Sequence, residues 1–223
     1  MCLGLSGGID SALVAVIASD ALGPNNVTAV MMPSRYSSTD SLTDAEQLIE
    51  NLGIASIKFP IKDIHSTFSE EWALNLNQDL FGVTDENLQS RIRGVLLMAF
   101  ANANGWLVLT TGNKSETAVG YSTLYGDTAG GFAVLKDVPK TWVYELAKYR
   151  NTISNVIPQR IIERPPSAEL APNQKDSDSL PEYKILDEII ELYVEKDLSL
   201  ASITEKGFDE KTVKRVICFT SRD

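Results

Sequence analysis

The sequence predicts an α/β fold, in which a parallel sheet carries helices on both faces. Two observations support this prediction: short β-branched runs alternate with helical segments in units of about 30 residues, and three predicted strands end in polar loops. Because such units form right-handed crossovers, their strands run parallel and are covered on both sides. The 223 residues are enough for one well-buried domain, and we expect a single domain over residues 1–223.

Breakers and apolar spacing set the limits of each element. Gly23-Pro24 and Gly53 end the first two helices, and Thr84 offers an N-cap hydroxyl for a long third helix. Residues 65–82 show no regular pattern, and residues 164–183 are a Pro-, Ser- and charge-rich loop. The predicted strands are 2–5, 27–32, 54–59 and 106–111; the predicted helices are 11–22, 39–52, 84–104, 141–151, one around Ile185, Ile189, Leu192 and Tyr193, and 211–219. The buried stripe of the long helix is expected at Ile92, Val95, Leu96 and Ala99.

Composition excludes several classes of function. The net charge of −10 argues against general binding of nucleic acid or of an anionic membrane surface. No apolar run approaches the roughly 20 residues of a membrane span and no signal peptide precedes the fold, so we expect a cytoplasmic protein. Cys2 and Cys218 form no CxxC pair, which leaves a disulfide framework or zinc site without support. Because a core strand starts at residue 2 and the last helix stops without a cap, we expect a fragment truncated at both ends.

Three polar loops follow predicted strands, at residues 6–11, 33–38 and 112–116. In an open parallel sheet, ligands bind beyond the carboxyl ends of the strands, so the loops of neighbouring strands form one pocket. The first loop offers glycines, backbone N–H groups and a helix N-terminus, which suit a phosphate chain. Asp10 stands where a Walker loop carries lysine, and its carboxylate would repel phosphate unless a divalent cation lay between them. We therefore expect Mg²⁺ on Asp10, with Glu116 as a second ligand.

The first loop, GLSGGIDS at residues 4–11, resembles the pyrophosphate loop of the N-type ATP pyrophosphatases. Later blocks are similar to the signatures of the NAD synthetase family. They are ENLQSRIRG (86–94), TTGNKSE (110–116), VGYSTLYGDTAGGF (119–132), KDVPKTWVYELA (136–147), and PPSAEL with SLPEY. VMMPSRYSS (30–38) and LTTGNKSE (109–116) are similar to the synthetase domain of the glutamine-dependent enzymes.

The resemblance implies an adenine nucleotide alpha hydrolase-like, Rossmann-like fold and a ligase. Such an enzyme amidates deamido-NAD to NAD with ATP, Mg²⁺ and ammonia through NAD-adenylate, releasing AMP and pyrophosphate. It also implies a homodimer or higher homo-oligomer, and glutamine as the nitrogen source where a glutaminase domain is fused. By similarity, ATP contacts Gly4, Leu5, Ser6, Gly7, Gly8, Ile9, Asp10, Ser11, Thr111, Lys140 and Ser167; deamido-NAD contacts Arg91, Tyr121, Ser122, Thr123 and Leu124; Asp10 and Glu116 hold Mg²⁺; and Asp10 and Lys140 are catalytic.

Two arginines on one predicted helix and the single histidine are further candidates for the site. Arg91 and Arg93 are about 200° apart around a helix, so one of them faces elsewhere, and the resemblance favours Arg91. His65, the single histidine, has no partner at a recognisable spacing, and we do not expect it to act as a general base.

Two alternatives stay open. Another ATP pyrophosphatase acting on a different carboxylate or base would share the first loop, but it would have no reason to contain GYSTLYGD. A nucleotide-sensing module without turnover would share the fold, since fold alone does not fix function. The joint presence of Asp10, Glu116 and Lys140 favours an enzyme over such a module.

Overall fold

Five parallel strands form the sheet of the computed structural model, which describes residues 1–220. The central strand β1 (Cys2–Gly4) pairs with β2 (Thr28–Met31) on one side and with β4 (Val108–Thr110) on the other. The edges are β3 (Ala55–Lys58) and β5 (Phe132–Ala133), and every pairing is parallel. The order β3-β2-β1-β4-β5 confirms the predicted parallel α/β class.

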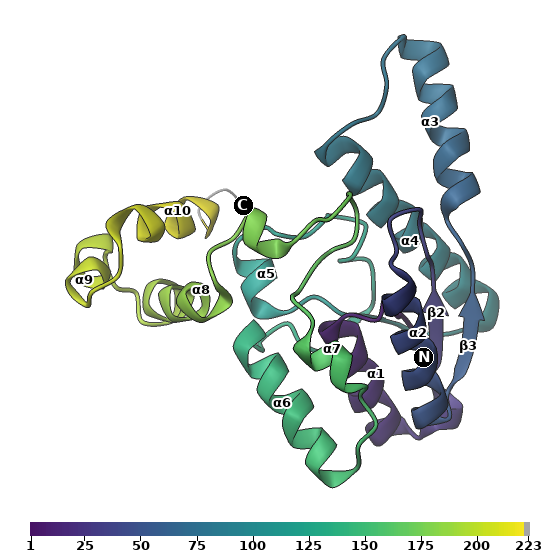
Figure 1. Cartoon of the computed structure of the whole chain (residues 1–223), viewed down its shortest axis with the longest axis horizontal. Helices are drawn as coiled ribbons and strands as arrows, with labels where there is room; N and C mark the ends of the chain where they lie inside the picture. Colours follow the sequence, from purple (N-terminus) through teal and green to yellow (C-terminus); the bar gives the residue numbers. More distant parts are fainter. Residues whose placement is uncertain (221–223) are drawn as a thin grey trace.

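Alternate residues of the strands belong to different cores, one on each face of the sheet. The helices of the first face are α1 (Ile9–Leu22), α2 (Thr39–Leu52), α6 (Lys140–Ile153) and α7 (Gln159–Glu163), and α4 (Val83–Asn104) covers the second face. Leu3 packs in the core that includes α1, α2 and α6, whereas its neighbour Cys2 packs in the core that includes α4. Figure 1 shows these helices around the sheet.

Helix α3 (Lys62–Leu76) occupies most of the segment in which the sequence shows no regular pattern, so that prediction was wrong. It projects from the upper right of the molecule in Figure 1. His65 is its one fully buried residue, so its apolar side chains form no one-sided buried stripe that periodicity would detect. His65 also has the partner that the spacing did not reveal, because its Nε2 lies 2.7 Å from Oδ1 of Asp85 on α4.

Helix α4 differs from its prediction in its start and in its buried face. It begins at Val83 after Gly82, and no side chain caps it, so the proposed Thr84 cap is wrong. Val95 is 67% exposed and Ala99 is exposed too, so the predicted stripe is only partly correct. The side of the helix that includes Gly94 is covered by the loop around residue 126, and it therefore buries polar residues as well as apolar ones. The buried residues are Asp85, Gln89, Ser90, Ile92, Gly94, Leu97 and Ala101.

The C-terminal helices form a unit with its own core, at the left of Figure 1. Leu186, Ile189 and Ile203 are fully buried in this core. Its elements are α8 (Tyr183–Ile190), the π-helical turn η3 (Glu191–Glu195), α9 (Leu200–Glu205) and α10 (Glu210–Thr220). The sequence predicted α8 and α10, but it did not predict α9, β5, α7 or the short helix α5 (Lys114–Ala118).

Two further observations concern the whole described part of the chain. Both cysteines are free, with Cys2 buried and Cys218 exposed. Among residues 1–220, no helix has both the length and the apolar character that a membrane crossing requires.

The strand order reverses at β1, because β2 follows it on one side and β4 on the other. The loop after β1 leads into α1, and the loop after β4 leads into α5. Both loops open at the carboxyl edge of the sheet, which is where doubly wound folds bind their ligands. The functional site is therefore expected between the N-termini of α1 and α5.

Candidate active site

The loop after β1 is held in a fixed shape by its two serines. Ser11 Oγ accepts a hydrogen bond from Ser6 N at 3.3 Å and donates to Gly8 O at 3.1 Å, while the two serine hydroxyls lie 3.1 Å apart. Gly7 has φ +85°, and a Cβ there would lie 2.2 Å from Ser41 O on α2, so only glycine fits. One side of this fixed loop, together with the start of α1, faces an open space.

That side is a cavity of about 600 Å³, whose wall includes every residue from Gly4 to Ser11. Thr111 and Ser167 also line it, as do Tyr121 and Ser122, so most of the predicted nucleotide contacts come together in one space. Its wall includes the apolar side chains Val30, Met32 and Leu97, and its polar end is the group of Asp10, Glu116 and Lys140, whose side chains are in contact. The cavity therefore offers both apolar surface for a base and polar groups for phosphates.

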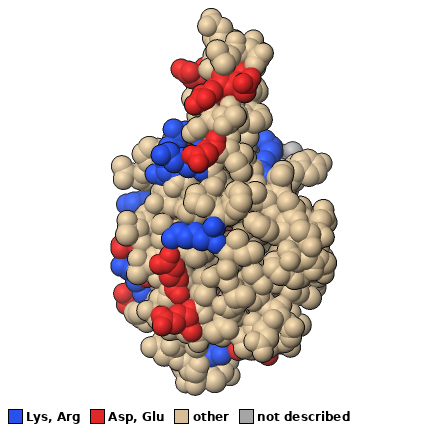
Figure 2. Space-filling view, turned by 90° about the vertical axis from the view of Figure 1, so that its right-hand side faces the viewer, with Lys and Arg blue, Asp and Glu red and all other residues tan. Residues whose placement is uncertain are grey.

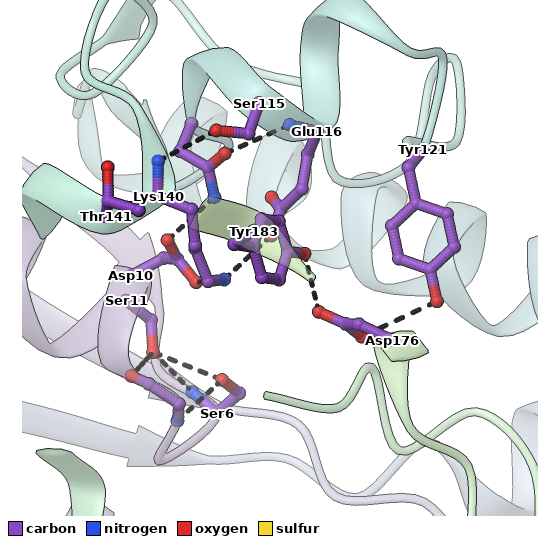
Figure 3. Close-up of polar contacts among 12 residues, drawn as sticks. Ser6, Asp10, Ser11, Ser115, Glu116, Tyr121, Lys140, Thr141, Asp176 and Tyr183 are labelled. Carbon is purple, nitrogen blue, oxygen red and sulfur yellow. Dashed lines mark hydrogen bonds and ion pairs between the residues drawn. The ribbon is translucent and has the colours of Figure 1, made fainter. Parts of the chain in front are cut away.

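Lys140 lies at the polar end between two carboxylates (Figure 3). Its Nζ is 2.5 Å from Asp10 Oδ2 and 2.8 Å from Glu116 Oε1, and the residue is only 2% exposed. Asn113 joins the two carboxylates' loops, since its Nδ2 donates to Asp10 Oδ1 at 2.8 Å and its Oδ1 accepts from Glu116 N at 3.0 Å. With both carboxylates ionised, two negative charges and one positive charge give this cluster a net charge of −1.

The electrostatics of the cluster follow from burial and from these neighbours. Burial, together with the charge of Asp10, raises the pKa of Glu116 to about 7. Burial alone would lower the pKa of Lys140, but Asp10 and Glu116 outweigh it and raise that pKa. Lys140 is therefore a permanent cation, whereas Glu116 exchanges a proton near neutral pH.

Three residues that the sequence did not single out, Asn113, Asp176 and Tyr183, surround the polar end, and Asp176 also lines the cavity. Tyr183 OH donates to Asp176 Oδ2 at 2.7 Å, and its ring centroid lies 5.2 Å from Lys140 Nζ. Tyr121 OH lies 3.5 Å from Asp176 Oδ1, a longer and weaker contact (Figure 3). Burial raises the pKa of Asp176. Asn113, Asp176 and Tyr183 lie within or beside family-like blocks, which is the only signal by which the sequence could have shown them.

Residues 164–170 close one wall of the cavity and are tied to the start of α2. Glu169, with φ +50°, accepts hydrogen bonds from Ser41 Oγ at 2.7 Å and from Ser38 N at 3.2 Å. Arg164 forms an ion pair with Asp44 of α2, with 2.5 Å between Nη2 and Oδ2. These contacts hold the Pro-rich segment against the loop after β1, although the sequence alone predicts only a loop there.

The predicted deamido-NAD contacts divide into two groups. Tyr121 and Ser122 line the cavity, but in residues 1–220 its wall does not include Thr123, Leu124 or Arg91. Thr123 is buried and its Oγ1 donates to Asn87, while Leu124 is 64% exposed. Arg91 Nε donates to Leu124 O at 3.2 Å on that outer surface, so the dinucleotide role of these outer residues stays a prediction.

Arg93, unlike Arg91, lies in the cavity wall. Its Nε donates to Met32 O at 3.1 Å, and burial lowers its pKa to about 10. The helical separation of Arg91 and Arg93 expected from the sequence therefore places them on different surfaces, and Arg93 is a site residue that the resemblance did not select.

Comparison with known proteins decides the assignment. A family model described as NAD synthase matches residues 1–223. The chain belongs to the NAD synthase family. A glutamine-dependent NAD(+) synthetase from Aquifex aeolicus is 54% identical over 215 residues, which are 96% of this chain and 38% of that protein. The chain spans about two fifths of the length of such curated relatives, since the share is 41% for the protein from Acinetobacter baylyi.

Solved structures of NAD synthases and a related enzyme share the fold. The glutamine-dependent NAD+ synthetase from Acinetobacter baumannii in complex with ADP has a TM-score of 0.72 and 48% identity, covering all of this chain and 40% of that one. The NMN synthetase from Francisella tularensis has a TM-score of 0.81 and 29% identity, covering 99% of this chain and 83% of that one. The family predicted from the sequence blocks is confirmed.

Proposed function

We propose that the chain catalyses the ATP-dependent amidation of deamido-NAD to NAD. The observation that carries this proposal is the buried Lys140, held by Asp10 and Glu116 at the polar end of the cavity. Membership of the NAD synthase family supports the choice of reaction. A nucleotide-sensing module would have no need for a buried cation beside a phosphate-binding loop.

In the first step, the nicotinate carboxylate of deamido-NAD attacks the α-phosphorus of ATP in line. A new P–O bond forms, the bond to pyrophosphate breaks, and NAD-adenylate results. The backbone N–H groups of the loop after β1, with the Ser6 and Ser11 hydroxyls, hold the departing pyrophosphate. Lys140 offsets the negative charge that develops on it.

In the second step, ammonia attacks the activated carboxyl carbon, a C–N bond forms and AMP leaves. Neither step requires a covalent bond to the protein, so positioning and charge stabilisation supply the rate. This agrees with a site that consists of a lysine, carboxylates and hydroxyls rather than an activated nucleophile.

Asp10 and Glu116 would hold Mg²⁺ in this proposal. Oxygen ligands suit this ion, which usually takes one or two protein carboxylates together with substrate phosphates. Residues 1–220 include no larger group of potential metal ligands, and two carboxylates with substrate suffice. A divalent cation would replace the proton that burial favours on Glu116, and when bound it would neutralise charge on the pyrophosphate.

The names of the relatives support a proposal for the source of nitrogen, since these proteins are named glutamine-dependent and are longer than this chain. We propose that a glutaminase domain joined to this chain supplies ammonia, and that free ammonia serves in its absence. We also propose a cytoplasmic location, where ATP and dinucleotides are available, and a homodimer, whose test is given below.

A product assay tests the reaction. Purified chain is incubated with ATP, Mg²⁺, ammonium and either deamido-NAD or nicotinate mononucleotide, and nucleotides are separated by chromatography. We expect AMP, pyrophosphate and NAD in equal amounts. ADP and phosphate as products would overturn the mechanism, whereas conversion of the mononucleotide alone would favour the activity for which the Francisella relative is named.

A further inference from the structure

Helix α8 belongs to the C-terminal unit, yet one of its faces reaches the active site. Tyr183 and Asp187 are four residues apart and therefore lie on the same side of the helix. The Tyr183 ring stands beside Lys140 Nζ, at 5.2 Å. The Asp187 carboxylate does not line the cavity, but it touches the two segments that carry the catalytic side chains.

Asp187 accepts three hydrogen bonds from α5 and α6. Its Oδ1 accepts from Ser115 Oγ, and its Oδ2 accepts from Thr141 N at 2.9 Å and Thr141 Oγ1 at 2.7 Å. Ser115 Oγ in turn accepts from Lys140 N at 2.8 Å. Ser115 directly precedes Glu116, and Thr141 directly follows Lys140, so one carboxylate ties together the backbone on both sides of the ion pair.

The same carboxylate accepts a hydrogen bond from a backbone N–H group at the N-terminus of α6. Pro139 is the N-cap residue of that helix and supplies no side-chain hydrogen bond, so the Thr141 N–H depends on a partner from elsewhere. A negative charge at a helix N-terminus is favourable. Lys114 adds a second link between α5 and the C-terminal unit, since its Nζ contacts Glu195 Oε1 of η3.

We propose that Asp187 is a positioning residue, through which the C-terminal helical unit sets the distance between Lys140 and its two carboxylates. The proposal rests on the proposed function for its catalytic readout. Lys140 acts on charge that develops only as pyrophosphate leaves, so displacing α6 reduces the rate of the chemical step more than it weakens ATP binding.

Asp187→Asn is the sharpest test, because the side chain keeps its shape but has one acceptor and one donor in place of two acceptors. The Ser115 hydroxyl then loses its acceptor, and the α6 N-terminus loses the charge. We expect kcat for AMP formation to fall at least about tenfold while KM for ATP changes less than about threefold. Asp187→Glu restores both acceptors and should recover part of the loss.

Ser115→Ala removes the hydroxyl that donates to Asp187, and so breaks the same hydrogen bond from the donor side. In the double variant with Asp187→Asn, the fold-loss in kcat should be clearly smaller than the product of the two single fold-losses, because both substitutions break the same connection. Glu188→Gln is the matched control: it removes an exposed carboxylate from the neighbouring position of α8 and should leave kcat unchanged. Equal kcat in Asp187→Asn and Glu188→Gln would overturn the proposal, as would purely multiplicative losses.

Amide hydrogen exchange provides a readout that does not depend on turnover. In Asp187→Asn, the amides of Lys140 and Thr141 should exchange at least about tenfold faster, while those in the centre of α8 keep their protection. Uniform loss of protection across α8 would mean that Asp187 merely stabilises its own helix. If the wild-type chain released no AMP, the proposed function would fail, and the exchange result would still decide the link.

Discussion

A buried lysine with two carboxylates is stable only while all three groups are present. Lys140 is 2% exposed, so the charges of Asp10 and Glu116 depend on it for compensation. Removing one partner of a buried ion pair leaves an unpaired charge, which costs far more than the pair contributes. The same arrangement serves catalysis, because the cation is already oriented when charge appears on the substrate.

Lys140→Gln should therefore lose stability as well as activity. We expect the free energy of unfolding to fall by about 3–5 kcal/mol, because two carboxylates remain buried without a cation. Urea unfolding followed by circular dichroism measures this. Lys148→Gln is the control, since its exposed contact with Glu145 should contribute about 0–1 kcal/mol. Similar losses in the two variants would contradict the argument.

The site could be predicted from the sequence only where a short motif carries the chemistry. Asp10, Glu116 and Lys140 lie in such motifs, and the structure brings them together. Asp187 acts only through tertiary contacts with Ser115 and Thr141, which no local pattern encodes. The same reason explains why Arg93 was passed over, because only the fold distinguishes the cavity side of α4 from its outer side.

At the scale of elements, the loop after β1 and the first turn of α2 form one rigid contact. Gly7 φ is +85°, and a Cβ would meet Ser41 O and two further backbone atoms of that residue within 3.0 Å. Ser41 also contacts Glu169 and Arg164, so it links the loop, α2 and the segment 164–170. The phosphate-binding shape therefore depends on three separate parts of the chain.

Gly7→Ala should disrupt this contact, because the new methyl group meets backbone and the backbone angle becomes strained. We expect ATP binding, measured by calorimetry, to weaken at least about tenfold, since the N–H groups lose their alignment. Gly8→Ala is a matched control, with its nearest contact at 3.3 Å to a serine hydroxyl. Equal affinities for the two variants would show that the loop adapts.

One physical reason explains which elements the sequence did not predict correctly. Strands β1, β2 and β4 and most of α1 are buried, so their apolar runs identify them. Helix α3 buries only His65, and α4 buries Asp85 against that histidine and Gln89 and Ser90 against loops, so neither presents the simple apolar stripe. Their helical character comes from propensity and tertiary contact rather than from a one-sided pattern.

At the scale of the molecule, pH should change stability through Glu116. Its folded pKa is about 7 and its ordinary value is 4.5, so between these values the folded state holds a proton that the unfolded state has lost. Stability therefore falls as pH rises through this window, by on the order of 3 kcal/mol, and levels off above it. Burial raises the pKa of Asp176 and Asp127, which adds to the same trend.

Denaturant unfolding at several pH values between 4 and 8 measures this effect. Glu116→Gln cannot ionise, and its profile should be flatter over the same range. Glu145→Gln, an exposed change on α6, should keep the wild-type slope. A slope that survives in Glu116→Gln would assign the effect to other groups.

The proposed homodimer is a prediction about the outer surface of α4. Val95 and Met98 are 67% and 42% exposed, and Leu124 and Tyr125 beside Arg91 are 64% and 80% exposed. Figure 2 shows that the face on the α3 side has a broad surface without charged side chains. Sedimentation velocity should show a dimer for the wild type and a folded monomer for Val95→Lys; a wild-type monomer would contradict the prediction.

The central place of β1 has a consequence for synthesis of the chain. The first 58 residues can complete the β3-β2-β1 half of the sheet, but Cys2 pairs with Val108 on its other side. Until β4 emerges from the ribosome, the middle strand of the future sheet is an open edge, able to add a strand from another nascent chain. The aggregation risk of this fold is therefore concentrated in the interval in which residues 59–107 are translated.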